Sequence, residues 1–82
     1  MTSLLLIKVG DRPKNALRVQ EILSKYGCAI KTRLGIHEFS SECAEDDEGI
    51  IIIELAQKNE DIEKMVQELE NLEKVKAIYQ EL

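Results

Sequence analysis

Residues 3–13 run Ser-Leu-Leu-Leu-Ile-Lys-Val-Gly-Asp-Arg-Pro, and this stretch decides the first half of the fold. The apolar run that ends at Val9 predicts a buried strand, because short apolar runs bounded by turn residues are typical of strands. Asp11 or Arg12 is placed to cap a helix. Pro13 fits the first helical turn, where a missing N–H costs nothing. The stretch therefore predicts a strand, a tight turn and the start of a helix.

The next two segments differ in their apolar period. Apolar residues first recur every three or four positions up to Gly27, which is typical of an amphipathic helix that ends at a glycine. They are Ala16, Val19, Ile22, Leu23 and Tyr26. Between residues 28 and 39 the period becomes two, which predicts a strand with one dry face. The predicted dry face carries Ile30, Thr32, Leu34 and Ile36, and the other face carries Lys31, Arg33, Gly35 and His37.

The second half repeats the alternation of strands and helix. Residues 40–49 are rich in acids and predict a polar loop, and the apolar run Ile50–Leu55 predicts a third strand. Asn59 is a good helix cap. A helical apolar stripe follows it, and residues 75–79 predict a fourth strand. The stripe consists of Ile62, Met65, Val66 and Leu69.

The element order strand, helix, strand, strand, helix, strand predicts the α+β class. With right-handed crossovers it gives a ferredoxin-like βαββαβ sandwich: an antiparallel sheet of order 4-1-3-2 with both helices on one face. The apolar pattern favours the same order independently. The first and third runs have apolar residues at consecutive positions, as central strands need, whereas the second has one apolar face, as an edge strand needs.

Two helices on one face leave the other face of the sheet bare. The bare face would expose a contiguous apolar patch, which on a small protein usually marks an interface. The patch consists of Leu4, Leu6, Ile50 and Ile52, or of their alternates. We therefore expect a homodimer, or a dimer of dimers, packed through sheet faces or edges. The alternative is a monomer whose charged residues shield the patch.

Length and charge bound the remaining possibilities. The 82 residues allow one domain, 1–82, and carry 11 basic and 16 acidic side chains, a net charge of −5. Residues 1–36 are basic and residues 37–82 are acidic. With three aromatic residues, however, base stacking is scarce, so direct nucleic-acid binding is not expected. No apolar run is long enough to cross a membrane, and no basic segment precedes Leu4. We expect a cytoplasmic protein without a secretory signal.

The segment from Val9 to Val19, followed by Tyr26 and Gly27, resembles the opening of the ACT domain, a regulatory module that binds small molecules. In that family a strand leads into Asp-Arg-Pro and a helix whose start helps to hold an amino acid or other small ligand at a subunit interface. Free N–H groups at a helix start favour a carboxylate. The resemblance implies a ligand site at Asp11, Arg12 and Asn15, and Arg33 could neutralise an anionic ligand. Lys14 and Asn15 replace the glycine of the family.

A second resemblance spans roughly residues 4–80. Asp11-Arg-Pro, the segments 19–27 and 30–36, the Ile-rich run and the end at Val75-Lys-Ala are similar to the iron-only hydrogenase system regulators. These short ACT-like proteins are related in fold to the ligand-binding domain of the nickel-responsive repressor. The resemblance implies a transcriptional or metabolic regulator that senses a ligand and carries no DNA-binding segment of its own.

His37 and Cys43 are candidate metal ligands. The nickel-responsive repressor has a His and a Cys at similar spacing in the corresponding hairpin, but its further His corresponds to Gly35 here. A transition-metal site needs three or four ligands, so an acidic neighbour or a second subunit would have to complete the set. No cofactor is required by the sequence, and no catalytic arrangement is recognisable, so we do not expect an enzyme. A purely structural interaction module is the remaining alternative.

Overall fold

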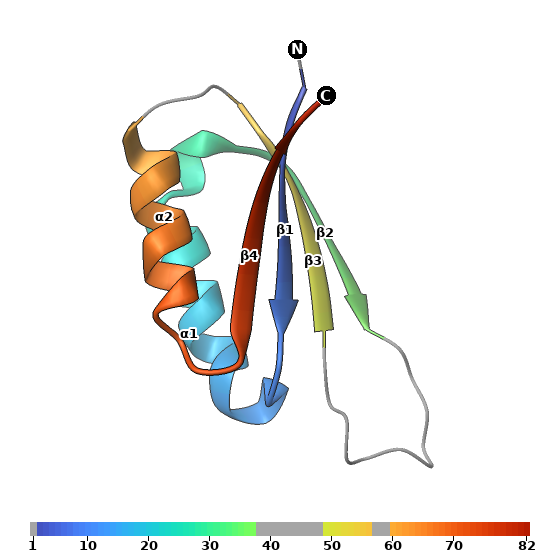
Figure 1. The fold of residues 1–82 in the computed structure, drawn as a ribbon, viewed down its shortest axis with the longest axis vertical. Coiled ribbons are helices and arrows are strands. Elements are labelled where there is room, and N and C mark those ends of the chain that lie inside the picture. The colour runs from blue at the N-terminus through green and yellow to red at the C-terminus, as the bar shows by residue number, and fades with distance from the viewer. Residues whose placement is uncertain (1, 38–48, 57–59) are drawn as a thin grey trace.

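The computed structural model describes residues 2–37, 49–56 and 60–82, without the side chains of residues 36, 37 and 60. Four strands and two α-helices alternate in the predicted order, with a short 3-10 helix after the first α-helix (Figure 1). They are β1 (Ser3–Val9), α1 (Arg12–Lys25), η1 (Gly27–Ala29), β2 (Ile30–His37), β3 (Gly49–Leu55), α2 (Glu60–Glu70) and β4 (Val75–Glu81). The helix stop at Gly27 is confirmed. The second strand begins at Ile30 instead of residue 28, because residues 27–29 form the 3-10 turn.

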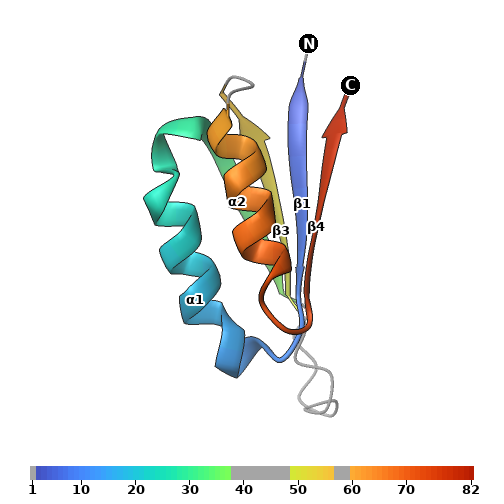
Figure 2. The same ribbon diagram turned by 60° about the vertical axis from the view of Figure 1, so that its left-hand side comes forward.

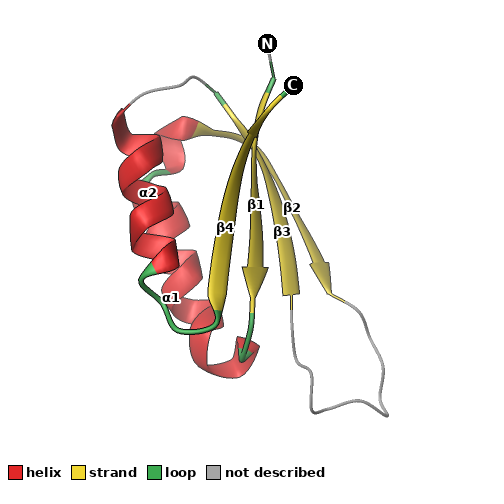
Figure 3. Cartoon of the chain, viewed as in Figure 1, coloured by secondary structure: helices red, strands yellow, loops and turns green. Residues whose placement is uncertain are grey.

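The sheet has the order β2-β3-β1-β4, and all three strand pairs are antiparallel. This is the ferredoxin-like arrangement that the sequence predicts. β1 lies at the centre, where Leu5 is paired with Ile53 of β3 on one side and Tyr79 of β4 on the other. Figure 3 shows both helices in one layer against one side of the sheet, so the opposite side has no covering layer among the described residues.

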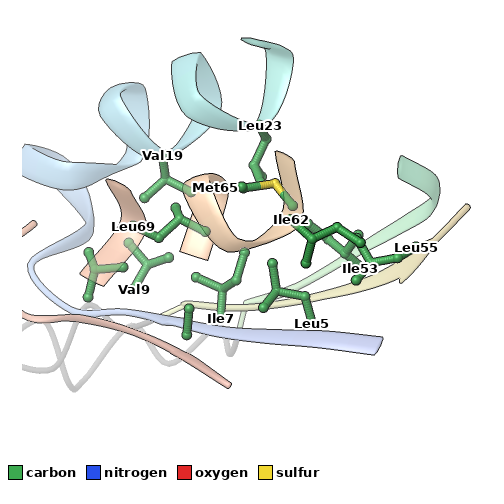
Figure 4. Packing of buried hydrophobic residues seen from close by; sticks show 12 residues of the cluster. Leu5, Ile7, Val9, Val19, Leu23, Ile53, Leu55, Ile62, Met65 and Leu69 are labelled. Carbon is green, nitrogen blue, oxygen red and sulfur yellow. The ribbon is translucent and has the colours of Figure 1, made fainter. Parts of the chain in front are cut away.

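Figure 2 shows the helix layer facing one side of the sheet, and the core side chains lie between the two layers (Figure 4). β1 contributes every second residue, because alternate side chains of a strand point to the same face. Leu5 and Ile53 are completely buried there, and Met65 and Leu69 of α2 belong to the same cluster and also have no exposed surface. The buried cluster comprises Leu5, Ile7, Val9, Val19, Leu23, Ile53, Leu55, Ile62, Met65, Leu69, Val75 and Ala77.

The apolar face predicted for β2 is not dry in this chain. A register shift between Ile30 and Thr32 places Ile30 beside Leu55 on the helix side, where it packs against the core. Beyond the shift, Leu34 lies beside Ile52 on the uncovered side and is 55% exposed. A β-bulge reverses the facing of every later residue in a strand, which period-two counting does not anticipate. Arg33 and Gly35 consequently face the helix layer.

The turn after β1 is held against the turn before β4 by a buried amide. Asn15 is 5% exposed, and its Nδ2 donates to the carbonyl oxygens of Gly10 at 2.7 Å and Glu73 at 2.8 Å. The N–H of Gly10 donates to the carbonyl of Lys74 at 2.7 Å, and a Cβ on Gly10 would lie 2.7 Å from that same oxygen. The approach therefore requires glycine at position 10 and a two-donor side chain at position 15.

One carboxylate in the last turn of α2 joins that helix to the end of α1. Glu68 of α2 accepts hydrogen bonds from the hydroxyl of Tyr26 and, at 3.0 Å, from Nζ of Lys25. The hydrogen bond from Tyr26 and then that from Lys25 hold the pKa of Glu68 below its usual range. The same bonds to Glu68 raise the pKa values of Tyr26 and Lys25. The three groups thus favour the charged acid and the protonated donors in the folded state.

We expect Asn15→Ala to lower the free energy of unfolding by about 1–3 kcal/mol, because it removes the amide that donates to the carbonyl oxygens of Gly10 and Glu73 in a buried and a partly buried hydrogen bond. Asn15→Asp should be at least as damaging, since its carboxylate would face those carbonyls with a negative charge. Urea unfolding measures both effects. The matched control Asn71→Ala, at an exposed position, should change stability by less than about 0.5 kcal/mol. Equal effects at positions 15 and 71 would contradict the assignment.

The pKa of Glu68 is lowered on folding, so its contribution to stability is present above the unfolded value of 4.5 and disappears as the pH falls through the folded pKa. Stability measured by urea unfolding should therefore decline below about pH 4.5 more steeply for the wild-type chain than for Glu68→Gln. Because Tyr26 has a raised pKa, its contribution is present at neutral pH and is lost in alkali. Parallel acid limbs for the two chains would show that Glu68 is not linked to folding.

Candidate ligand-binding pocket

A cavity of about 170 Å³ lies on the helix side of the sheet, between α1 and the β2–β3 hairpin strands. Its lining residues are Val9, Arg12, Ala16, Val19, Gln20, Arg33, Gly35, Gly49, Ile50 and Ile51. The cavity exists because the helix-facing positions of β2 do not supply apolar bulk. Gly35 has no side chain, and a Cβ placed there would meet nothing within 4 Å. The pocket is therefore a direct consequence of the residues that the register shift turns toward α1.

The pocket combines an apolar interior with two cations. Val9 and Val19 are buried core residues that form part of its wall. Arg12 enters from the first turn of α1 and is half-buried, whereas Arg33 enters from β2 and is exposed. None of the described lining residues is acidic. In a chain with a net charge of −5, this places two guanidinium groups around a small apolar cavity whose described lining holds no carboxylate.

Arg33 forms no ion pair with any residue in the described part of the chain, whereas its neighbour Lys31 lies 3.8 Å from a carboxylate oxygen of Glu54. A guanidinium group offers five N–H donors in a planar fork that matches a carboxylate or phosphate. The apolar wall lowers the local dielectric constant, which strengthens such a contact. The arrangement can therefore bind a small anion that also carries an apolar portion.

The four residues predicted for a ligand site separate into two pairs. Arg12 and Arg33 line the same pocket, as a site for an anion requires. Asp11 and Asn15 instead border a cavity of about 90 Å³ beside the turn at residues 73–74. Both donors of the Asn15 amide are directed at backbone carbonyls, so this side chain acts as a brace. Asp11 occupies the helix-cap position with a left-handed backbone, φ 49°, but its side chain makes no capping bond.

Gln20 and Gly35 belong to the pocket but were not predicted from the sequence. Gln20 follows Arg12 by eight residues, about two helical turns, and Ala16 lies between them on the same side of α1. That spacing was available in the sequence and would have indicated Gln20. Gly35 could not have been found in this way, since the face that it occupies depends on the bulge in β2.

The predicted metal ligands lie outside the side chains that the structure describes. His37 is the last residue of β2, but its side chain is not described, and Cys43 lies outside the described residues. Within residues 2–37, 49–56 and 60–82, no three His, Cys, Asp or Glu side chains are grouped to hold a metal ion. Cys28 is a free, exposed thiol. The pairing of His37 with Cys43 stays a prediction.

Among the helices of the described part, none is long and apolar enough to cross a membrane.

Comparisons with known proteins add a fold and no activity. No protein-family model matches the chain, and no curated protein matches it. The structure is similar to that of the uncharacterized protein TM1266 from Thermotoga maritima, with a TM-score of 0.80 and 25% identity over 96% of this chain and 92% of that one. A dimeric ferredoxin-like protein of unknown function from Thermobifida fusca gives a TM-score of 0.49 and 14% identity, covering 99% of this chain and 92% of that one.

Proposed function

We propose that this protein is a non-enzymatic, ACT-like regulatory module that binds a small organic anion in the pocket between α1 and the β2–β3 strands. The observation that carries the proposal is the convergence of Arg12 and Arg33 on one apolar cavity with no described carboxylate in its lining. A carboxylate or phosphate group would lie between the two guanidinium groups. The apolar part of the ligand would contact Val19 and Ile51.

The size of the cavity restricts the ligand. A volume of about 170 Å³ corresponds to roughly six water-sized groups, since each water occupies about 30 Å³ in the liquid. A short carboxylic acid, an amino acid or a small phosphate ester has this bulk, whereas a nucleotide does not. Gln20 offers both an amide donor and an acceptor at the α1 wall, which could discriminate between ligands that share an anionic group.

A regulatory role fits this pocket better than catalysis. The described lining contains neither a nucleophile nor a general base, because its polar side chains are two arginines and one glutamine. The resemblance to the iron-only hydrogenase system regulators supports the same class. Since Arg12 belongs to α1 and Arg33 to β2, an anion would link the helix layer to the edge of the sheet. It would shift any equilibrium in which the two elements separate, by as much as its affinities for the two states differ.

The pocket predicts that small anions stabilise the protein against heat. Thermal unfolding would be followed at constant ionic strength with inorganic phosphate, acetate, succinate and glutamate, and with uncharged succinamide as the negative control. A ligand at ten times its Kd adds about 1.4 kcal/mol, which corresponds to a rise in Tm of several degrees for a domain of this size. We expect at least one anion to raise Tm and succinamide to have no effect.

Replacement of Arg12 or Arg33 by Gln should weaken binding of that anion by about 10- to 100-fold in titration calorimetry, because each removes a charge-assisted contact. Arg18→Gln is the matched control, since Arg18 is also on α1 but is exposed and does not line the pocket. An affinity that falls equally in all three variants would indicate a general charge effect. Undiminished binding by Arg12→Gln and Arg33→Gln would refute the site.

A further inference from the structure

The uncovered face of the sheet carries its side chains in three rows that cross the strands. The strand registers place Leu34, Ile52, Leu6 and Ile78 side by side, one residue from each strand, and we call this set the middle row. On one side of it lies the Glu54 row, which consists of Thr32, Glu54, Leu4 and Gln80. On the other side lies the Lys8 row, whose described side chains are Ile50, Lys8 and Lys76.

The middle row is apolar from one edge of the sheet to the other. Leu34 is 55% exposed and Ile78 48%, so the two edge strands leave large aliphatic side chains in water. Strands of seven residues spaced about 4.8 Å apart give a four-stranded face of about 19 by 23 Å, or about 400 Å². The apolar middle row crosses this face between two rows that contain polar side chains, and an exposed apolar strip with a polar rim is typical of an interaction surface.

We propose that this face binds the same face of a second copy, with a two-fold axis that runs between the two sheets and across the strands. Rotation about that axis lays the middle row on the middle row of the partner, so the apolar side chains of both copies lose contact with water. Sheets that pack face to face in this way lie about 10 Å apart with interdigitating side chains. The contact uses one patch on both copies, as a closed dimer requires.

The charges select this axis over the alternative. Rotation about an axis that runs across the strands lays the Glu54 row of one copy over the Lys8 row of the other. Lys8 on β1 then lies next to the position of Glu54 on β3 of the second copy, displaced by one strand spacing. A two-fold axis parallel to the strands would instead lay Lys8 and Lys76 over the same row of the partner. Like charges in a partly desolvated contact are repulsive, whereas opposite charges at its rim set the orientation. The face is therefore electrostatically self-complementary in one orientation.

Most of the described acidic side chains lie away from this face. The three rows contain one described acid, Glu54, against Lys8 and Lys76, although the whole chain has a net charge of −5. On α2, by contrast, Asp61 and Glu63 are exposed. Two copies can thus approach through the sheet without bringing these carboxylates of α2 together. The pocket at Arg12 and Arg33 lies on the other side of the sheet, so the dimer and the ligand site can be tested independently.

Sedimentation velocity over micromolar to millimolar concentrations tests the proposal on the full chain. The wild-type chain should sediment as a dimer that dissociates on dilution. Leu34→Glu and Ile78→Glu should each raise the dimer Kd at least tenfold, because each buries a carboxylate at the apolar row. Both residues are exposed on edge strands, so the variants should keep the wild-type circular dichroism spectrum. Leu17→Glu is the matched control, because Leu17 is 69% exposed on α1 and lies outside the proposed contact. The dimer Kd of this variant should equal that of the wild-type chain.

A charge swap tests the orientation. Lys8→Glu and Glu54→Lys should each weaken the dimer several-fold, and the chain that carries both changes should recover most of the wild-type affinity. A double variant no stronger than the single ones would overturn the crossed two-fold axis. A wild-type monomer at millimolar concentration would overturn the dimer. A dimer that survives Leu34→Glu and Ile78→Glu would overturn the face, and would indicate pairing through the strand edges instead.

Discussion

The double pairing of β1 is the constraint on which the rest of the structure depends. This strand is hydrogen-bonded to β3 on one side and to β4 on the other, so Ser3–Val9 joins both halves of the fold. Leu5 and Ile7 point to the helices and have almost no exposed surface. On the uncovered face the same strand carries Leu4 and Leu6 before Lys8, so β1 supplies apolar side chains to both faces of the sheet.

Two helices cannot cover a four-stranded sheet completely, and the incomplete cover accounts for both candidate surfaces. On the helix side, the uncovered part lies over β2, where Arg33 and Gly35 border the pocket instead of filling it. On the opposite side, the four aliphatic residues of the middle row have no partner within the described chain. The candidate ligand site and the proposed self-association surface thus lie on opposite faces of the sheet, and both follow from its incomplete cover.

The bonds that fix the helices are few and specific. Asn15 ties the start of α1 to the turn before β4, and Glu68 ties the end of α1 to α2. Because Arg12 lies one turn before Asn15 on α1, the brace at Asn15 also fixes the position of the pocket wall. Asn15, which the sequence predicted as a ligand contact, therefore helps to hold Arg12 in its place beside the pocket.

The sequence by itself determined the element order, the central positions of β1 and β3, and the helix boundaries at Pro13 and Gly27, because periodicity and turn chemistry are local properties of the chain. It also indicated that Arg12 and Arg33 carry charge suited to an anion. The tertiary structure decided that these two share a cavity while Asp11 and Asn15 lie elsewhere. It also decided that Leu34 faces away from the helices. Both outcomes depend on the register shift after Ile30 and on the close approach of residues 10 and 74. Such long-range contacts leave no periodic trace in a single sequence.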